Sequence, residues 1–62
     1  MKDLGKTIAK YRKEHKLNQS QLAKELENYD IYVKQNSISA WELGTATPNA
    51  RQFLALCEIL EI

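Results

Sequence analysis

A compact set of amide and hydroxyl side chains lies in the stretch QNSISAWEL, residues 35–43. If this stretch is a helix, Ile38 and Trp41 share one side, and the polar residues near its start share the other. This second side, which we expect to face outward, consists of Gln35, Asn36, Ser39 and Ala40. Amides both donate and accept hydrogen bonds, which suits the pattern of donors and acceptors on base-pair edges. The alternative, an ordinary polar surface, would be favoured for these residue types alone.

Catalytic and metal-binding chemistry have less support in the chain. His15, Cys57, Ser20 and Ser39 are of conventional catalytic types. His15 falls at the end of an expected helix and Cys57 on an apolar stripe, so no nucleophile–base pair is indicated and we expect no enzyme activity. A structural zinc site needs about four clustered ligands, so one Cys and one His predict no metal. We also expect no other cofactor and no small-molecule substrate, and interpret Cys57 as a small core residue.

Two expected helices precede the polar stretch. A buried stripe predicts the first, from residue 3 or 4 to about residue 14, with Asp3 as its N-cap. This stripe consists of Leu4, Ile8 and Tyr11. Asn18 is a strong N-cap for the second helix, and Gln21 three places later completes a capping-box pattern. The apolar face of the second helix consists of Leu22, Ala23 and Leu26.

The polar stretch itself is predicted to be a third helix, followed by a fourth. Gly44 is a residue type favoured just after a helix end, and Leu43 before it is expected to pack partly. Thr47 followed by Pro48 predicts the start of the fourth helix, which should run to about residue 60. Its expected apolar stripe consists of Phe53, Leu54, Leu56, Cys57 and Leu60.

The segment ENYDIYVK, residues 27–34, shows no helical period. Its β-rich letters could form a short strand, but a single strand would have no partner here. We interpret the segment as a loop that returns Val33, and either Ile31 or Tyr29, to the core. Tyrosines left exposed would be free to stack on a ligand or to hydrogen bond to it.

The length and composition restrict the class of protein. Sixty-two residues allow one small domain, and 44% hydrophobic with 27% charged residues is typical of an ordinary soluble domain. No apolar run approaches the roughly 18 residues of a membrane span, and the N-terminus lacks the apolar core of a signal peptide. The single cysteine fits a reducing compartment. We therefore expect a cytoplasmic protein.

Charge is unevenly spread, although the net charge is only +1. Residues 1–16 carry +4 and the remaining 46 residues carry −3. The basic residues of the first segment are Lys2, Lys6, Lys10, Arg12, Lys13 and Lys16. A basic end on a near-neutral domain indicates an anionic partner contacted locally, and a solvated helix face explains the pattern equally well.

The chain resembles the Cro/CI-type helix-turn-helix family of phage and bacterial repressors in three pieces. These are LGKTIAKYRKEHKLNQSQLAKEL, then QNSISAWELG, then PNARQFLALCEIL, which together cover nearly the whole chain. Each piece alone is common, whereas all three in this order form a specific match. The resemblance implies an all-α, lambda-repressor-like fold of four helices, where the family usually has five. The domain would be residues 1–62, with the helix-turn-helix at about 18–43.

The resemblance also implies which residues contact DNA. The family's base-reading positions correspond to Gln35, Asn36, Ser39 and Ala40. The expected phosphate-binding residues are Gln19, Lys34, Ser37, Thr45, Thr47 and Asn49. Amides in the first group could pair bidentately with adenine, and the Ala40 methyl could meet thymine.

The resemblance also implies three residues that brace the recognition helix. Gln19 matches a glutamine that bonds a phosphate and supports the first residue of that helix. Arg12 and Glu42 match an ion pair that ties the first helix to the end of the third. A phosphate-binding role for Arg12 is the less favoured alternative.

The chain departs from the family pattern at three places. The turn between the second and third helices is longer by about five residues, which leaves the angle between them open. Lys34 stands where the family usually has a Ser or Thr cap, and it could meet a phosphate instead. Many relatives continue into a fifth helix and a dimerisation domain, whereas this chain ends at Glu61 and Ile62.

The sequence therefore predicts sequence-specific binding of double-stranded DNA by a recognition helix in the major groove. We expect a transcriptional regulator, with repression favoured, that is bacterial or phage-encoded and nucleoid-associated when bound. A monomer makes few contacts, so we expect a homodimer on a palindromic operator with half-sites roughly 34 Å apart. The alternative is a helical protein-interaction module or antitoxin-like partner, which would present Tyr29, Ile31 and Tyr32.

Overall fold

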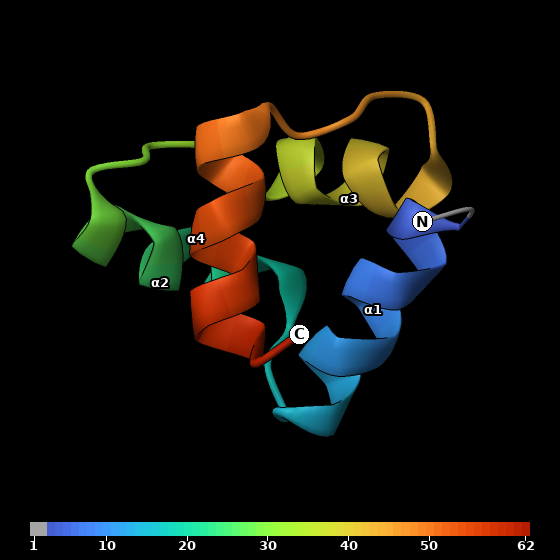
Figure 1. The fold of residues 1–62 in the computed structure, drawn as a ribbon, viewed down its shortest axis with the longest axis horizontal. Coiled ribbons are helices and arrows are strands. Elements are labelled where there is room, and N and C mark those ends of the chain that lie inside the picture. Colours follow the sequence, from blue (N-terminus) through green and yellow to red (C-terminus); the bar gives the residue numbers. More distant parts are fainter. Residues whose placement is uncertain (1–2) are drawn as a thin grey trace.

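The protein is described by a computed structural model of residues 3–62, and Lys2, counted above in the basic segment, lies outside them. The elements are α1 (Leu4–Glu14), α2 (Gln19–Leu26), a short 3₁₀ helix η1 (Glu27–Tyr29), α3 (Gln35–Leu43) and α4 (Ala50–Leu60). Figure 1 shows α4 in front, α2 and α1 on either side of it, and α3 near its N-terminal end. The predicted all-α fold is confirmed for the described residues.

One hydrophobic core joins the α-helices. Its fully buried side chains come from all of them: Ile8, Leu22, Leu26, Ile38, Leu56 and Leu60. Burying one such side chain fully stabilises the fold by about 1.5–3 kcal/mol. Trp41 of α3 is also buried, so the inward side of α3 is the one predicted from Ile38 and Trp41.

The starts of α1 and α2 differ, because only α2 has a side-chain cap. The Oδ1 of Asn18 accepts the N–H of Gln21 at 2.7 Å, and the Oε1 of Gln21 accepts the N–H of Asn18 at 2.8 Å. The predicted capping box is therefore confirmed. Asp3 occupies the N-cap position of α1, but its carboxylate makes no capping hydrogen bond. The prediction that this carboxylate caps α1 was therefore wrong: Asp3 takes part only through its backbone carbonyl, which accepts the N–H of Thr7 as the first hydrogen bond of the helix and also the Thr7 hydroxyl.

The fourth helix begins two residues later than Thr47 and Pro48 predicted. Asn49 is its N-cap, and a second reciprocal capping box joins Asn49 to Gln52, with both hydrogen bonds at 2.8 Å. The prediction from Thr47 and Pro48 was wrong because Asn49 and Gln52 together satisfy two backbone groups, which a single hydroxyl cap cannot do. Thr47 stays exposed in the connection, and Cys57 is half-buried on α4.

The end of α3 follows the prediction for Gly44. This glycine adopts a left-handed backbone conformation with φ of 83°, which residues other than glycine adopt only at an energetic cost. The chain reverses there, and the N–H of Thr45 donates to the carbonyl of Ala40 at 3.0 Å. The helix is thereby ended without leaving that carbonyl unpaired.

Two leucines were predicted to pack and do not. Leu43 is 75% exposed and Leu54 is 66% exposed. On α3 the inward side is already occupied by Ile38 and Trp41, and Leu43 projects from another side. On α4 the small residue Ala55 is buried in place of Leu54. The prediction from apolar residue type was therefore wrong for both leucines, because neighbouring residues occupy the buried face of each helix.

The 27–34 segment was predicted correctly as a loop only from residue 30 onward. Its first residues continue α2 as η1, until Asp30 adopts left-handed backbone with φ of 58°. The N–H of Ile31 then donates to the carbonyl of Leu26 at 3.1 Å, and Ile31 is buried. Val33 packs partly against the core. Tyr29 does not return to the core, since it is exposed.

His15 connects the end of α1 to the end of α4. Its Nδ1 lies 2.9 Å from the carbonyl oxygen of Tyr11, and its Nε2 lies 3.2 Å from Oε1 of Glu61. Both partners are acceptors, so both ring nitrogens must carry protons to satisfy them. The hydrogen bond to Tyr11, followed by that to Glu61, raises the pKa of His15 above 6.5.

This contact predicts a small pH dependence of stability. Because the folded-state pKa is raised, the contribution of His15 is full below about pH 6.5 and is lost as the pH rises through the folded-state pKa. Urea unfolding should show the wild-type midpoint falling between about pH 6 and about pH 8. The fall should be absent in His15→Gln and reduced in Glu61→Gln. The same pH profile in wild type and His15→Gln would contradict the assignment.

Candidate nucleic-acid interface

A buried ion pair fixes the end of α3 to α1. The Arg12 guanidinium donates from Nε to Oε2 of Glu42 at 2.6 Å and from Nη2 to Oε1 at 3.0 Å. Its Nη1 donates to the carbonyl of Leu17 at 2.8 Å. The two side chains are only 11% and 9% exposed. Bidentate geometry of this kind holds both side chains in one orientation.

Both groups of this pair are held in their charged forms. Burial by itself raises the pKa of Glu42, but the hydrogen bonds from Arg12 and Gln19 and the Arg12 charge outweigh it. The net pKa of Glu42 is therefore lower than its ordinary value of 4.5. The hydrogen bond to Glu42 is the main cause that raises the pKa of Arg12.

Gln19 connects the ion pair to the first residue of α3. The Nε2 of Gln19 donates to Oε1 of Glu42 at 3.0 Å, and the Nε2 of Gln35 donates to Oε1 of Gln19. A carboxylate can only accept, so Gln19 must turn its nitrogen toward Glu42 and its oxygen toward Gln35. Gln35 must then use one N–H on Gln19. Its own Oε1 and its second N–H are left for another partner.

The predicted base-reading residues lie together on α3. Gln35 and Asn36 are exposed in its first turn, and Ser39 and Ala40 are half-buried one turn later. The spacing i, i+1, i+4 and i+5 puts them on the side opposite the buried Ile38. This side of α3 therefore faces outward, while the buried residues on its opposite side hold the helix in the core.

The predicted phosphate-binding residues lie in three separate segments. These segments are the first turn of α2, the start of α3, and the connection between α3 and α4. The residues concerned are Gln19, Lys34, Ser37, Thr45, Thr47 and Asn49. Lys34 is exposed at the N-cap position of α3 and makes no capping hydrogen bond, which leaves its ammonium to reach outward.

Two of these residues already have structural roles. The Thr45 hydroxyl donates to the carbonyl of Ala40 at 3.3 Å, and the Asn49 side chain accepts from Gln52 as the cap of α4. Thr45 must release its bond before it can donate to a phosphate. The capping bond of Asn49 uses only the side-chain oxygen, so its amide N–H groups remain for a phosphate.

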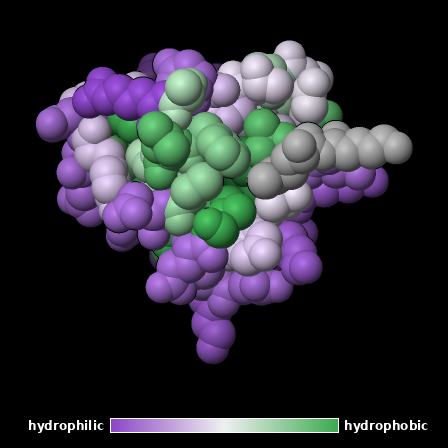
Figure 2. Space-filling view, viewed as in Figure 1, coloured by the Kyte–Doolittle hydropathy of each residue, from purple (hydrophilic) through white to green (hydrophobic). Residues whose placement is uncertain are grey.

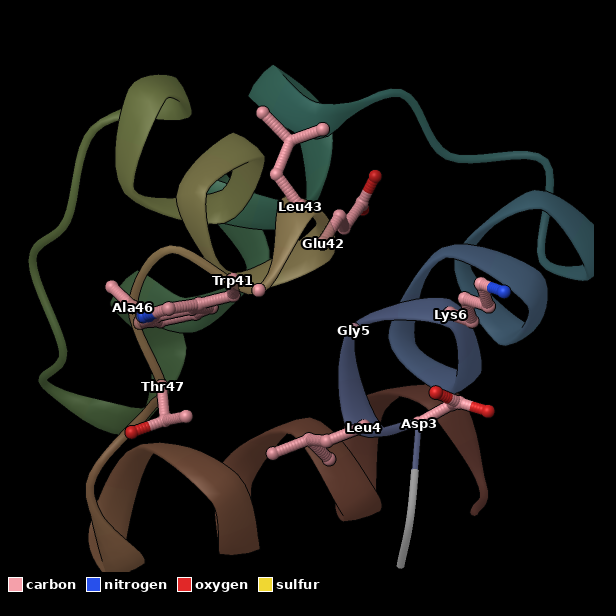
Figure 3. A pocket seen from close by; sticks show the side chains of 10 residues that line it. Asp3, Leu4, Gly5, Lys6, Trp41, Glu42, Leu43, Ala46 and Thr47 are labelled. Carbon is pink, nitrogen blue, oxygen red and sulfur yellow. The ribbon is translucent and has the colours of Figure 1, made fainter.

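Sequence reasoning missed Gly5 as a determinant of this arrangement. A Cβ at residue 5 would lie 2.5 Å from the carbonyl oxygens of Trp41 and Glu42. Figure 3 shows Gly5 beside the end of α3, at the edge of a hollow of about 300 Å³ that Thr47 also lines. A glycine within a helical pattern was the available signal, because it costs about 1 kcal/mol relative to alanine and usually has a packing reason.

Residues 3–62 contain no group of three or more His, Cys, Asp or Glu side chains placed to hold a metal ion. None of the helices in this range has the length and apolar character needed to span a bilayer.

The fold and this polar surface define a helix-turn-helix domain, with α2 supporting α3. A family model described as a helix-turn-helix domain matches residues 5–62, which is almost the entire chain. Comparison with curated proteins and with solved structures found no match. The chain belongs to the helix-turn-helix domain family, and its resemblance to the Cro/CI type is confirmed. Membership assigns it DNA binding and a place in transcription regulation, in a family that is typically not enzymatic.

Proposed function

We propose that this protein binds double-stranded DNA sequence-specifically by placing α3 in the major groove. The observation that carries the proposal is the hydrogen-bonded series from Glu42 through Gln19 to Gln35. It presents the first side chain of α3 in one orientation before any ligand binds. Preorganised groups lose little freedom on binding and therefore discriminate better between base pairs.

The orientation of Gln35 selects a kind of base. Its free Oε1 accepts and its free N–H donates, which is the pair that the N6 amino group and N7 of adenine require. Asn36, Ser39 and Ala40 extend the reading surface along the same side of α3. The Ala40 methyl suits contact with a thymine methyl.

The contacts with phosphates set affinity and register in this proposal. Lys34 supplies charge, and the first turn of α2 offers backbone N–H groups beside Gln19. Ser37, Thr45, Thr47 and Asn49 add neutral donors around the groove. Such contacts position the domain on any duplex, so their loss should weaken binding without changing the preferred sequence.

The regulatory setting follows from the small size of this surface. One helix reads only a few base pairs, so two copies on a palindromic operator would supply the affinity that one lacks. We propose residues 1–62 as one domain, with the helix-turn-helix at about residues 18–43. It would act as a homodimeric repressor in the cytoplasm of a bacterium, encoded by that cell or a phage, and associate with the nucleoid when bound.

The second candidate function is binding of a partner protein through the 27–34 segment. Tyr32 is 73% exposed and Tyr29 is also exposed, which favours such a surface. Ile31 was expected to be part of the same anchor, but it is buried in the core. The two tyrosines alone are therefore the anchor of this alternative.

The test separates base reading from phosphate binding. Random duplexes should first be selected against the wild-type protein to define an operator, with binding measured across a salt titration. Gln35→Ala should weaken operator binding by about ten- to a hundredfold and leave binding to random DNA unchanged. Thr47→Ala should weaken both. Asn28→Ala, an exposed amide on η1, serves as the unaffected control.

Two results would overturn the proposal. Equal losses on operator and random DNA for Gln35→Ala would remove its base-reading role. Selection that enriches no sequence, together with binding that does not respond to salt, would reject DNA recognition by this surface altogether.

A further inference from the structure

A hollow beside α4 lies outside the proposed DNA surface. It measures about 390 Å³ and is lined by Tyr29, Ile31, Arg51, Leu54, Ala55 and Glu58. Figure 2 shows apolar side chains gathered over α4 on this face of the molecule. Leu54 is 66% exposed at the hollow, whereas Ala55 within it is only 4% exposed. A protruding leucine therefore stands next to a depression left by a small residue.

The α4 residues of this hollow are arranged symmetrically along the helix. Arg51, Leu54, Ala55 and Glu58 follow the i, i+3, i+4, i+7 pattern of one helix face. The midpoint of the set lies between Leu54 and Ala55, and the two opposite charges are equally far from it. A surface of this kind is complementary to its own copy turned by a two-fold axis.

The symmetric arrangement specifies the contacts between two antiparallel copies of α4. Arg51 would face Glu58 of the partner subunit, and the same ion pair would form a second time across the axis. Leu54 would face the partner's Ala55 and enter the hollow beside it. The Arg51 guanidinium is already held at the rim, since its Nη2 donates to the carbonyl of Tyr29 at 3.3 Å.

We infer that this face of α4 binds α4 of a second copy of the chain, antiparallel and with two-fold symmetry. The inference rests on the proposed function, because binding to a palindromic site requires two copies, and it adds the surface through which they associate. The docking face belongs to α4 together with Tyr29 and Ile31, whereas the proposed DNA surface belongs to α2, α3 and the connection after α3. One copy can therefore present both surfaces.

The first test is sedimentation of the full chain over a wide concentration range. The wild-type chain should dimerise, and Leu54→Glu should raise the dissociation constant at least tenfold. Leu43→Glu is the matched control, because Leu43 is 75% exposed on α3 and outside the docking face. It should dimerise like the wild type. Both side chains are exposed, so unfolding midpoints should confirm that each variant is folded.

The charges provide a second test that depends on the antiparallel pairing. Arg51→Glu and Glu58→Arg each place two like-charged pairs across the axis, so each should weaken the dimer about tenfold or more. The double variant R51E/E58R restores both pairs with reversed polarity and should recover most of the loss. Association through another surface would not show this recovery.

Three results would overturn the inference: a wild-type chain that is monomeric at every concentration, equal effects of the two leucine variants, or no recovery in the double variant. Failure of the proposed function would look different. If the chain dimerises as described but selects no DNA sequence, the docking face is supported and the proposed DNA binding is contradicted. Conversely, if wild type and Leu54→Glu bind a half-site equally well, the proposed DNA binding is supported whatever the sedimentation result.

Discussion

Replacing Glu42 with alanine should lower the free energy of unfolding by about 3 kcal/mol, because it leaves the buried Arg12 guanidinium without its counter-charge. Arg12 would keep only its hydrogen bond to the carbonyl of Leu17. Stability for a chain of this length is about 3–9 kcal/mol, so a large share would be lost. Urea unfolding followed by circular dichroism measures the change.

Two comparisons make this expectation specific to the pair. Glu25→Ala, at an exposed position of α2, should change stability by no more than about 0.5 kcal/mol. Replacing both partners, in Arg12→Met with Glu42→Leu, should restore much of the loss, since no buried charge is then left alone. If Glu42→Ala resembles Glu25→Ala, the pair contributes little and the anchoring of α3 must lie elsewhere.

The same carboxylate predicts how acid affects the fold. The pKa of Glu42 is lower in the folded state than its ordinary value of 4.5. Its contribution is therefore full above about pH 4.5 and is lost as the pH falls through the folded-state pKa. Unfolding midpoints between pH 7 and about pH 3 should fall less steeply for Glu42→Ala than for the wild type.

Loss of Glu42 should also affect the proposed DNA-binding surface. Gln19 would no longer have a carboxylate that dictates the direction of its amide, and it could then either donate to Gln35 or accept from it. Gln35 would lose its single orientation. Discrimination between adenine and other bases should fall in Glu42→Ala even at temperatures where the variant is fully folded.

The helices and their inward sides could be predicted from the sequence because local chemistry determines them. Asn18 with Gln21 specifies a helix start by itself, and the stripe of α1 specifies its buried side. The start of α4 was misplaced because two local signals compete within a few residues. Thr47 and Pro48 form one, Asn49 and Gln52 the other, and a sequence does not reveal which cap gives the more complete hydrogen bonding.

What could not be predicted depends on contacts between segments that are distant in the chain. The outward position of Leu54 depends on how α4 packs against the rest of the core. The spacing of apolar residues along the sequence does not indicate this packing. The family resemblance implied that Gln19 braces the start of α3. The link from Gln19 on to Glu42 crosses 23 residues, and only the structure shows it. Residues that touch DNA in the proposal were thus named from the sequence, whereas the support that orients them was found in three dimensions.

Gly5→Ala should destabilise the protein by about 2 kcal/mol, although alanine is the better helix former. Its Cβ would lie 2.5 Å from two carbonyl oxygens of α3, those of Trp41 and Glu42, and 2.9 Å from the Glu42 carbonyl carbon. These are backbone atoms and cannot rotate away, so α1 and α3 must separate. Overpacking of this kind costs about 1–3 kcal/mol or more, against a gain of about 1 kcal/mol in helix propensity.

Thermal unfolding distinguishes the two opposing effects of this substitution by sign. A loss of about 2 kcal/mol should lower the Tm of so small a domain by roughly 8–16 °C, whereas propensity alone would raise it. Lys6→Ala, exposed at the next position of α1, should leave the Tm nearly unchanged. An equal or higher Tm for Gly5→Ala would show that the two helices do not approach as closely as described. A lower Tm together with reduced operator discrimination would tie the closeness of α1 and α3 to the position of Glu42, and through Gln19 to the orientation of Gln35.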